Sequence, residues 1–411
     1  MNPIHGKKII LGITGSIAAY KGAELASKLT QSGAAVQTIL TEAAVKFISP
    51  LTFQSLTGEK AYTDQDLWGS KAHVLHVSLA RNADMILVAP ATATTIAKLA
   101  NGLADNLLTI TALAGGGQKK VPVVIAPAMD GGMYSNPATQ ENIQRLSQRG
   151  AVFIGPEEGH LASGLTGKGR MTEPQEIQSN IRFLFSRNGD FKEIKLVITA
   201  GGTIEDLDPV RFISNRSSGK QGYAIAQAAL DSGAEVTLIT APVNLKPPFG
   251  AEIIAIRNAS EMKNAVLENC KDADVICMAA AVSDYRPSMT LTEKIKKEGN
   301  KLILPLETTD DILLELSKYR KENDNPVVVV GFAAESEKLI ENAKSKLKSK
   351  DLDFIVANDI TAKNAGFGSE TNQVTFLFPD GHQDKLPMLT KYEVGEQIIQ
   401  KVYEILEKNK K

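Results

Sequence analysis

Short apolar runs alternate with helical patterns along the first part of the chain. They predict strands at residues 9–14, 34–40, 84–90, 121–128 and 151–155, and a helix over residues 17–31. Strands that are apolar on both faces and separated by helices are typical of a parallel sheet covered on both sides. We therefore predict an α/β domain with right-handed crossovers.

The same pattern starts again after a polar linker at residues 186–193. Strands are predicted at 196–200, 235–240, 252–256, 274–280, 326–334 and 353–358. A hairpin over 373–389 turns at Asp380-Gly381, and a final helix covers 391–407. We expect two tandem Rossmann-like domains, residues 1–187 and 188–411, as a chain of 411 residues favours.

Two stretches interrupt this alternation. Residues 155–172 are rich in glycine and polar residues, and a loop of that length is usually functional or disordered. After the strand at 196–200, about fifteen loop-like residues precede a helix that begins near Ser218, where two to six would be ordinary. The second stretch carries Arg211, Asn215, Arg216 and Lys220 and ends at a helix N-terminus, so it predicts an anion site.

Charge and cysteine content exclude several classes of protein. A net charge of -1 argues against a nucleic-acid binder held by phosphate contacts. The two cysteines, Cys270 and Cys277, form no CxxC pair, which indicates a reducing compartment and excludes a cysteine-rich zinc site. The apolar run near the N-terminus is too short for a signal peptide or a membrane span. We expect a soluble cytoplasmic protein without nucleic-acid or membrane partners.

The first half carries a candidate phosphate turn. The segment GITGSIAAYK follows a strand and opens a helix, although a tight glycine turn without a ligand would have the same pattern. It lacks G-x-G-x-x-G, and Thr41 stands where an acidic residue would hold an NAD ribose, so a dinucleotide-dependent oxidoreductase is disfavoured. Small residues at Pro90, Ala91 and Thr92 end another strand and would admit a flat ring.

Five motifs of the first half resemble the flavin-dependent cysteine decarboxylases. They are GSIAAYK, HVSLA, APATA, PAM-x-x-x-M-Y and ASGLTGKGRM. Their order and spacing match the decarboxylase half of the bifunctional phosphopantothenoylcysteine decarboxylase/phosphopantothenate–cysteine ligase family of coenzyme A synthesis, and the resemblance covers the whole chain. It implies a flavodoxin-like flavoprotein sheet, followed by a doubly wound sheet with an added β-hairpin.

The resemblance also implies the chemistry of this half. The substrate thiol is oxidised by FMN to a thioaldehyde, carbon dioxide is lost, and the hydride is returned. His76 matches the family's catalytic histidine, although a lone histidine is more often a surface or core residue. Gly15, Ser16 and Ile17 match the turn that holds the FMN phosphate, with Thr41 and the Pro90–Thr92 segment around the flavin. Trimers are expected through this half.

Two residues depart from the family's pattern. Asp130 stands where the family has Asn, and Ser163 where it has Cys; the Asn is credited with holding the substrate and the Cys with proton delivery. An ionised Asp130 about 4 Å from a carboxylate would be repelled by about 4 kcal/mol at an effective dielectric constant near 20. We expect it to be protonated, paired with a cation or used differently. A serine hydroxyl is a weaker acid than a thiol, so Ser163 is a poor proton donor.

These departures leave three outcomes: a compensated decarboxylase, an enzyme that releases an oxidised enethiol, or an inactive half. We expect the compensated enzyme, because the other motifs are intact. The alternative is a functional ligase whose FMN-binding half is impaired or serves only as a scaffold.

The second half resembles the ligase of the same family through ITAGGTIEDLDPVRFISNRSSGKQG, which is not a Walker A loop. AAAVSDY, EKIKK, GFAAE and KLKSKDLDFIVAND continue the match. The resemblance implies that CTP and Mg²⁺ activate the carboxylate of 4′-phosphopantothenate as an acyl-cytidylate, which the amine of L-cysteine then attacks. Charge on the triphosphate must be offset by the metal and by lysines.

The match assigns Arg211 and Asn215 to the acyl-phosphate or substrate phosphate, and Asp284 and Lys294 to the nucleotide, with Asp284 as an Mg²⁺ ligand. The rest of the CTP pocket would comprise Thr309, Asp310, Asp311, Ile312, Phe332, Lys346 and Lys350. The run TTDDI departs from the family's commoner N-P-D-I, so its assignment is weaker. This half is expected to dimerise, and dimers combined with trimers allow a dodecamer.

Overall fold

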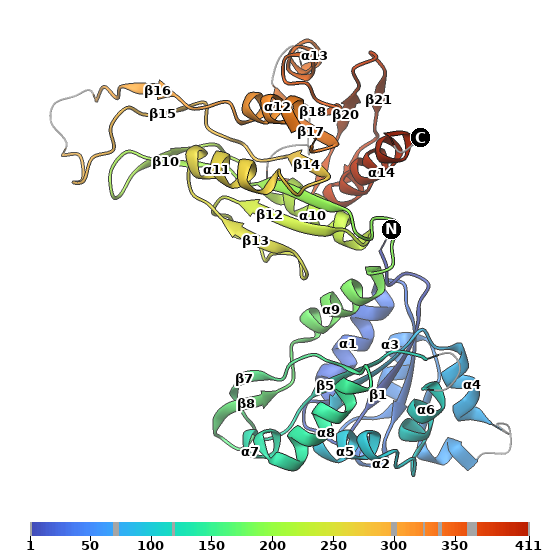
Figure 1. The fold of residues 1–411 in the computed structure, drawn as a ribbon. Coiled ribbons are helices and arrows are strands. Elements are labelled where there is room, and N and C mark those ends of the chain that lie inside the picture. The colour runs from blue at the N-terminus through green and yellow to red at the C-terminus, as the bar shows by residue number, and fades with distance from the viewer. Residues whose placement is uncertain are drawn as a thin grey trace. The chain divides into compact units, whose positions relative to one another are not determined.

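A computed structural model describes residues 2–68, 74–116, 120–296, 302–323, 325–335, 339–359 and 368–409, without the side chains of Glu335 and Asp359. The predicted residue Lys297 of the EKIKK motif lies outside this range. The chain divides into two compact units, Asn2–Phe185 (the first unit) and Ser186–Lys411 (the second unit). The two-domain α/β prediction is confirmed (Figure 1). None of the helices in the described ranges is long and apolar enough to cross a membrane.

The first unit is built on a six-stranded parallel sheet with the order β3-β2-β1-β4-β5-β6. Its strands are β1 (Lys8–Ile13), β2 (Ala35–Leu40), β3 (Ala61–Thr63), β4 (Met85–Ala91), β5 (Val123–Pro127) and β6 (Val152–Phe153). Successive residues of β1 enter opposite cores, since Ile9 and Leu11 belong to one buried cluster and Ile10 to the other. This alternation explains why the strands read as continuous apolar runs.

Helices cover both faces of this sheet. One core is closed by α1 (Ala19–Gln31), α3 (Pro50–Thr57) and α9 (Pro174–Ser186). The other is closed by α4 (Leu75–Asn82), α5 (Ala93–Asn101), α6 (Leu107–Gly115) and α8 (Pro137–Gln148). The short elements α2 (Glu42–Val45), η1 (Asp64–Trp68) and α7 (Gly131–Ser135) complete the connections.

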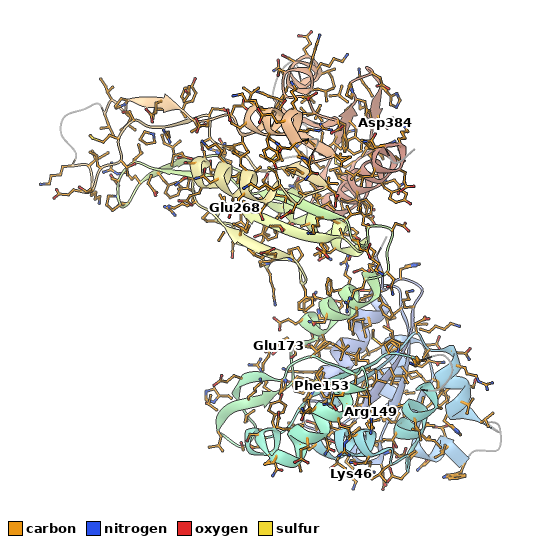
Figure 2. All side chains as sticks on the ribbon, viewed as in Figure 1. Lys46, Arg149, Phe153, Glu173, Glu268 and Asp384 are labelled. Atoms are coloured by element: carbon orange, nitrogen blue, oxygen red, sulfur yellow. The ribbon has the colours of Figure 1, made fainter. Side chains whose placement is uncertain are left out.

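The glycine-rich stretch at 155–172 is a hairpin rather than an irregular loop. Strands β7 (Glu157–His160) and β8 (Thr166–Arg170) pair antiparallel, with a register shift near Glu157. The hairpin lies against α7, because a Cβ on Gly169 would be 2.2 Å from the carbonyl oxygen of Met129. Glu173, at the start of α9, accepts from the ammonium of Lys21 at 2.9 Å and also pairs with Arg170 (Figure 2). These contacts tie the hairpin to α1 and α9.

The second unit repeats the topology and extends it. Its eight-stranded sheet has the order β13-β12-β9-β14-β17-β18-β20-β21, in which β20 pairs antiparallel with β18, and β21 pairs antiparallel with β20. The strands are β9 (Lys195–Ala200), β12 (Glu235–Thr240), β13 (Glu252–Ala255), β14 (Val275–Met278), β17 (Val328–Glu335), β18 (Phe354–Asp359), β20 (Val374–Leu377) and β21 (Gln383–Lys385). The predicted hairpin around Asp380-Gly381 is therefore confirmed as β20–β21.

Helices again pack on this sheet. One core is closed by α11 (Ala259–Asn269), α12 (Ile312–Asn323) and α13 (Leu339–Ser349). The remaining helices, α10 (Lys220–Asp231) and α14 (Lys391–Asn409), pack closely, because a Cβ on Gly395 would lie 2.9 Å from the carbonyl oxygen of Ala224. Asp384 on β21 pairs with Lys401 of α14 at 3.1 Å and so fixes the added hairpin (Figure 2).

The long connection after β9 contains structure that the sequence did not predict. β10 (Ile204–Asp206) and β11 (Phe212–Ser214) form an antiparallel ribbon, and α10 begins at Lys220 rather than near Ser218. A second ribbon is formed by β15 (Tyr285–Pro287) and β16 (Leu306–Thr308). Both ribbons extend beyond the main sheet of this unit (Figure 1). The short strands β19 (Thr371–Asn372) and β22 (Leu389–Thr390) pair beside the start of α14.

Candidate active sites

Both sheets reverse their strand order at one position, between β1 and β4 in the first unit and between β9 and β14 in the second. Open α/β sheets bind ligands beyond the carboxyl ends of the strands at such a position. Of the segments that the sequence predicts as sites, Gly15–Ile17 follows β1 and Pro90–Thr92 spans the end of β4. Asn215 lies in the long connection after β9, and Asp284 follows β14. The fold therefore brings each pair of segments to one edge.

In the first unit, Thr14 joins the two strand ends. Its hydroxyl donates to the carbonyl oxygen of Pro90 at 2.7 Å and accepts from the backbone N–H of Thr92 at 3.0 Å. A Cβ on Gly15 would lie 2.5 Å from the Cβ of Ala43, so glycine is required where the turn passes α2. The helix that follows has no side-chain hydrogen bond from its N-cap, Ala18. The Ser16 hydroxyl instead accepts from the N–H of Ala18 at 3.3 Å, and the turn places this helix start beside small side chains.

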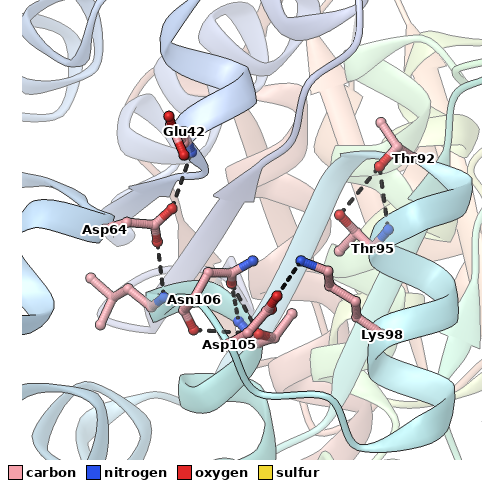
Figure 3. Close-up of polar contacts among 9 residues, drawn as sticks. Glu42, Asp64, Thr92, Thr95, Lys98, Asp105 and Asn106 are labelled. Carbon is pink, nitrogen blue, oxygen red and sulfur yellow. Dashed lines mark hydrogen bonds and ion pairs between the residues drawn. The ribbon is translucent and has the colours of Figure 1, made fainter.

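Neighbouring helix starts are fixed by polar side chains (Figure 3). Thr41 caps α2 by accepting from the N–H of Ala44 at 3.3 Å, and Thr92 caps α5 through the N–H of Thr95 at 3.3 Å. Asp64 accepts from the N–H groups of Glu42 at 3.1 Å and Leu107 at 2.9 Å, which joins the starts of α2 and α6 (Figure 3). The candidate flavin-binding residues therefore belong to one rigid edge.

Asp130 and Ser163, the two departures from the family pattern, contact each other. The Ser163 hydroxyl donates to Oδ2 of Asp130 at 2.6 Å, while Oδ1 accepts from the N–H of Gly132 at 2.9 Å and caps α7. The hydrogen bond from Ser163, followed by that from Gly132, lowers the pKa of Asp130. The carboxylate is therefore ionised at neutral pH. Of the three expectations for Asp130, the structure favours a different role, because its partners are a hydroxyl and an amide.

A cavity of about 540 Å³ opens beside this pair. Its lining includes Asp130, Tyr134, Gln140, Thr166 and Lys168. The ammonium of Lys168 lies 5.6 Å from the centre of the Tyr134 ring. The same cavity thus holds one anion and one cation from the α7–β8 region.

His76 is the second residue of α4 and is half-buried. Within the described ranges, no hydrogen bond joins it to Asp130, Ser163 or the Gly15 turn. The structure of a single chain therefore does not bring His76 together with those residues.

The second unit contains a cavity of about 860 Å³ at the β9/β14 position. Of the predicted residues, it brings together Asn215, Asp284, Phe332, Lys346 and the run from Thr309 to Ile312. The Nζ of Lys346 donates to the carbonyl oxygen of Phe332 at 2.9 Å. Four separate segments of the chain therefore supply the predicted nucleotide pocket.

Hydrogen bonds to backbone carbonyl oxygens fix the segment after β14, which lines this cavity. The side-chain amide of Asn215 donates to the carbonyl oxygens of Ala281 and Val282, both at 3.2 Å. The Thr309 hydroxyl donates to the carbonyl oxygen of Ser283 at 2.6 Å, and the Thr309 N–H donates to the backbone carbonyl oxygen of Asp284 at 3.0 Å. These bonds connect the segment after β14 to Asn215 on one side and to Thr309 on the other.

Three predicted residues are not among the described residues that line the cavity: Arg211, Lys294 and Lys350. Lys350 pairs with Asp311 just outside it. Arg211 lies beyond β10, where its Nε is 3.0 Å from the carboxylate of Asp208 and its guanidinium donates to the carbonyl oxygen of Ile295. Arg211 therefore connects the β10–β11 ribbon to the segment that contains Lys294.

Sequence comparisons agree with this two-site architecture. Residues 191–406 match the DNA/pantothenate metabolism flavoprotein C-terminal domain, and residues 2–186 match the family described as Flavoprotein. The Coenzyme A biosynthesis bifunctional protein CoaBC of Bacillus subtilis (strain 168) is 45% identical over 402 residues, with 97% of each chain covered. The chain belongs to the CoaBC family.

Another relative, the Cysteine/Cysteine sulfinic acid decarboxylase of an unidentified prokaryote, is 44% identical over 365 residues, 86% of this chain and 98% of that protein. A solved structure of the C-terminal domain of a CoaBC protein is 38% identical and covers 52% of this chain and 96% of its own, with a TM-score of 0.44.

As a CoaBC protein, the chain is a bifunctional enzyme of coenzyme A biosynthesis with the ligase and decarboxylase activities that the motifs predict. The alternative of a ligase with a scaffold-only flavin half is not favoured, because CoaBC relatives match along the whole chain.

The structure also places unpredicted residues in the CoaBC ligase cavity. The sequence indicates only a possible phosphate-binding role for Lys220 and assigns no role to Asn358, Asn372 or Lys391, all of which line the cavity. They come from α10, β18, β19 and the first residue of α14. Lys220 could be found because it follows the long loop. Asn358 lies in the KLKSKDLDFIVAND motif, whereas Asn372 and Lys391 have no sequence signal, because only folding brings the last third of the chain to the cavity.

Proposed function

We propose that this CoaBC protein makes 4′-phosphopantetheine in two steps, CTP-dependent ligation in the second unit and FMN-dependent decarboxylation in the first. The observation that carries the ligase is the 860 Å³ cavity, which gathers Asn215, Asp284 and Lys346 from separate segments. Its volume is within the range of small-molecule sites.

In the ligase cavity, the cations and the Asp284 carboxylate serve different groups. Lys346 and the start of α10 suit phosphate groups of CTP. Asp284 suits Mg²⁺, because magnesium that arrives with a nucleotide is held by one or two carboxylates together with phosphate oxygens. Thr309, Asp310, Asp311, Ile312 and Phe332 would line the nucleotide. Asn215 would hold the acyl oxygen, so that the cysteine amine attacks a fixed carbonyl.

In the first unit, the Gly15–Ile17 turn fits the phosphate of FMN, and Thr41, Pro90, Ala91 and Thr92 would border the ring. Glycine at position 15 and the uncapped start of α1 support this assignment. Bound FMN supplies the two-electron oxidation of the substrate thiol and the return of hydride. The protein's own contribution is to position the cysteinyl carboxylate and to move protons, for which His76 is the proposed catalytic base or acid.

We propose that the decarboxylase is compensated for its two departures. The Ser163 hydroxyl donates to one oxygen of Asp130, and the Gly132 N–H donates to the other. These hydrogen bonds within the protein offset the negative charge of Asp130. Lys168 lines the same cavity and can attract the substrate's anionic groups. Ser163 then positions the β7–β8 hairpin and leaves proton donation to water or His76.

A second candidate activity for the first unit is decarboxylation of free cysteine or cysteine sulfinate. One relative carries that name. An ionised Asp130 would also attract the α-ammonium of a free amino acid, which phosphopantothenoylcysteine lacks because its nitrogen is acylated.

We also propose a functional boundary between residues 187 and 188, a cytoplasmic location and a homo-oligomer. The two ribbons of the second unit expose apolar side chains, with Phe212 53%, Tyr285 55% and Met289 69% exposed. Such a surface suits a dimer in which Lys294 reaches the other copy's cavity. Trimers through the first unit would complete a dodecamer.

One assay tests both activities. The purified protein is given 4′-phosphopantothenate, L-cysteine, CTP and Mg²⁺, and every product is identified by mass. We expect 4′-phosphopantetheine, CMP, pyrophosphate and carbon dioxide. Accumulation of the acylcysteine or the enethiol would refute the compensated decarboxylase, and faster carbon dioxide release from free cysteine would favour the second candidate.

A further inference from the structure

One wall of the ligase cavity is a basic cluster with no assigned role. It consists of Lys220 at the start of α10, Asn358 on β18, Asn372 on β19 and Lys391 at the start of α14. Lys391 is only 6% exposed although it lines the cavity. A buried ammonium is stabilised by anions, and a ligand of the cavity could supply one at this position.

The charges of Lys220, Lys391 and Glu370 act on one another. Burial lowers the pKa of Lys391, and the charge of Lys220 lowers it further, whereas Glu370 raises it. Lys220 forms an ion pair with Glu370, and its Nζ also donates to the carbonyl oxygen of Gly368 at 2.9 Å. Glu370 therefore stabilises the charge of both lysines.

Glu370 is poorly anchored to this cluster. Its side chain is 82% exposed, against 27% for Lys220. Exposed ion pairs contribute only about 0–1 kcal/mol, so a multiply charged ligand can displace this carboxylate. Its main chain is better fixed, because its carbonyl oxygen accepts from the N–H of Lys391 at 3.0 Å.

Two further groups point to a ligand. The N-cap of α10, Gly219, provides no side-chain hydrogen bond, so the first amides of this 12-residue helix are not capped in that way. Asn358 has a buried Oδ1 without a hydrogen-bond partner in the described structure. Rotation of that amide would instead present its N–H₂ group as a donor to an anion. An unsatisfied buried polar group is expensive, which is consistent with a site completed by its substrate.

We propose that Lys391 is a substrate-binding residue of the ligase, which together with Lys220 holds the polyphosphate of the nucleotide, and that Glu370 occupies the anion position until the polyphosphate displaces it. This inference rests on the proposed ligase function. After the substrate carboxylate displaces pyrophosphate from CTP to form the acyl-cytidylate, return of Glu370 to Lys220 would assist release of that pyrophosphate.

Calorimetric binding of inorganic pyrophosphate to the full-length protein, without other substrates, tests the proposal. We expect Lys391→Met to weaken binding about tenfold or more, as loss of a charge-assisted contact implies. Glu370→Gln should tighten binding about threefold, because it removes the competing anion. Lys385→Met removes an exposed charge from β21 and should change binding less than about twofold.

Unchanged pyrophosphate binding by Lys391→Met would overturn the role of Lys391. Unchanged or weaker binding by Glu370→Gln would overturn the displacement, and this variant alters only an exposed side chain, so it remains informative if Lys391→Met does not fold. Ligation assays on the same proteins should show a lower KM for CTP in Glu370→Gln. Failure of ligation in every protein, with the expected binding pattern, would refute the proposed function while leaving the anion site supported.

Discussion

An amide and a carboxylate have nearly the same shape but opposite hydrogen-bonding character at one terminal atom. At position 130 the family's Asn could donate from that atom, whereas Asp130 accepts there from Ser163. The two departures therefore form one donor–acceptor pair, and changing either residue alone leaves the other without its partner.

Ser163→Ala should reduce the rate of carbon dioxide release less than about tenfold, because the hydroxyl positions the hairpin and is not the proton donor. Loss of a general acid would instead reduce the rate about a hundredfold or more. In an Asp130→Asn background the same change should have a smaller effect, since the charge-assisted hydrogen bond from Ser163 is already replaced by a weaker neutral one. Single-turnover rates of the four proteins measure this coupling. Independent, multiplicative losses would contradict it.

The sequence predicted the identity of the site residues better than their contacts. Asp130 and Ser163 were both recognised as unusual, but nothing in the sequence indicates that side chains 33 positions apart share a hydrogen bond. Arg211 was assigned to the substrate because it lies in a basic loop. Its actual partners, Asp208 and the carbonyl oxygen of Ile295, depend on tertiary folding of the segment around residue 295.

At the scale of elements, the main strands were predictable because both their faces are buried, and the small ribbons were not. β7–β8 and β10–β11 are short and polar and lack alternation, so they have no periodic signal. Their stability comes instead from individual polar contacts. Two of these contacts give testable consequences.

The first concerns Glu157 at the base of the β7–β8 hairpin. Burial raises its pKa, as do a hydrogen bond that the protonated carboxyl donates to Glu176 and the charge of Glu176, while the charge of Arg170 lowers it. A carboxyl with a raised pKa binds its proton more tightly in the folded state. Its contribution to stability is complete below the ordinary pKa of 4.5 and is lost as the pH rises through the folded-state value.

Glu157→Gln mimics the protonated form and should therefore raise the melting temperature of the first unit by about 2 °C at pH 8. The difference should shrink as the pH falls toward 5. Melting curves between these pH values, with the exposed neighbour Glu158→Gln as the control, measure it. A difference that grows on acidification would have the wrong sign.

The second concerns Asp208 in the turn that joins β10 to β11. Burial opposes its ionisation, but the backbone N–H groups of Val210, Ile295 and Arg211 and the charge of Arg211 outweigh this and lower its pKa. Asp208→Asn leaves one oxygen acceptor instead of two. The segment around Ile295 should loosen and Lys294 with it.

For Asp208→Asn we expect faster proteolysis near residue 295 and a fall in ligase kcat/KM of roughly tenfold, since small displacements of a site residue have effects of this size. Pyrophosphate binding should be unchanged. Glu307→Gln on β16, which removes an exposed ion pair with Arg286, is the matched control. Equal proteolysis of both variants would refute the anchoring role of Asp208.

At the scale of the whole molecule, each unit has its own sheet and its own buried clusters. We therefore expect two thermal transitions in calorimetry. FMN at a hundred times its Kd should raise only one by about 5–10 °C, and pyrophosphate should raise only the other by a similar amount. A single transition that both ligands shift would show that the units unfold together.

The ion pair between Lys220 and Glu370 has a consequence for selectivity inside a cell. A tethered carboxylate acts as an anion present at a high, constant local concentration, which free anions must outcompete. Monovalent ions and single phosphates gain too little from the two lysines to do so, whereas a chain of phosphates can contact both. The resting protein would thereby ignore the abundant simple anions of its surroundings and respond to nucleoside triphosphates.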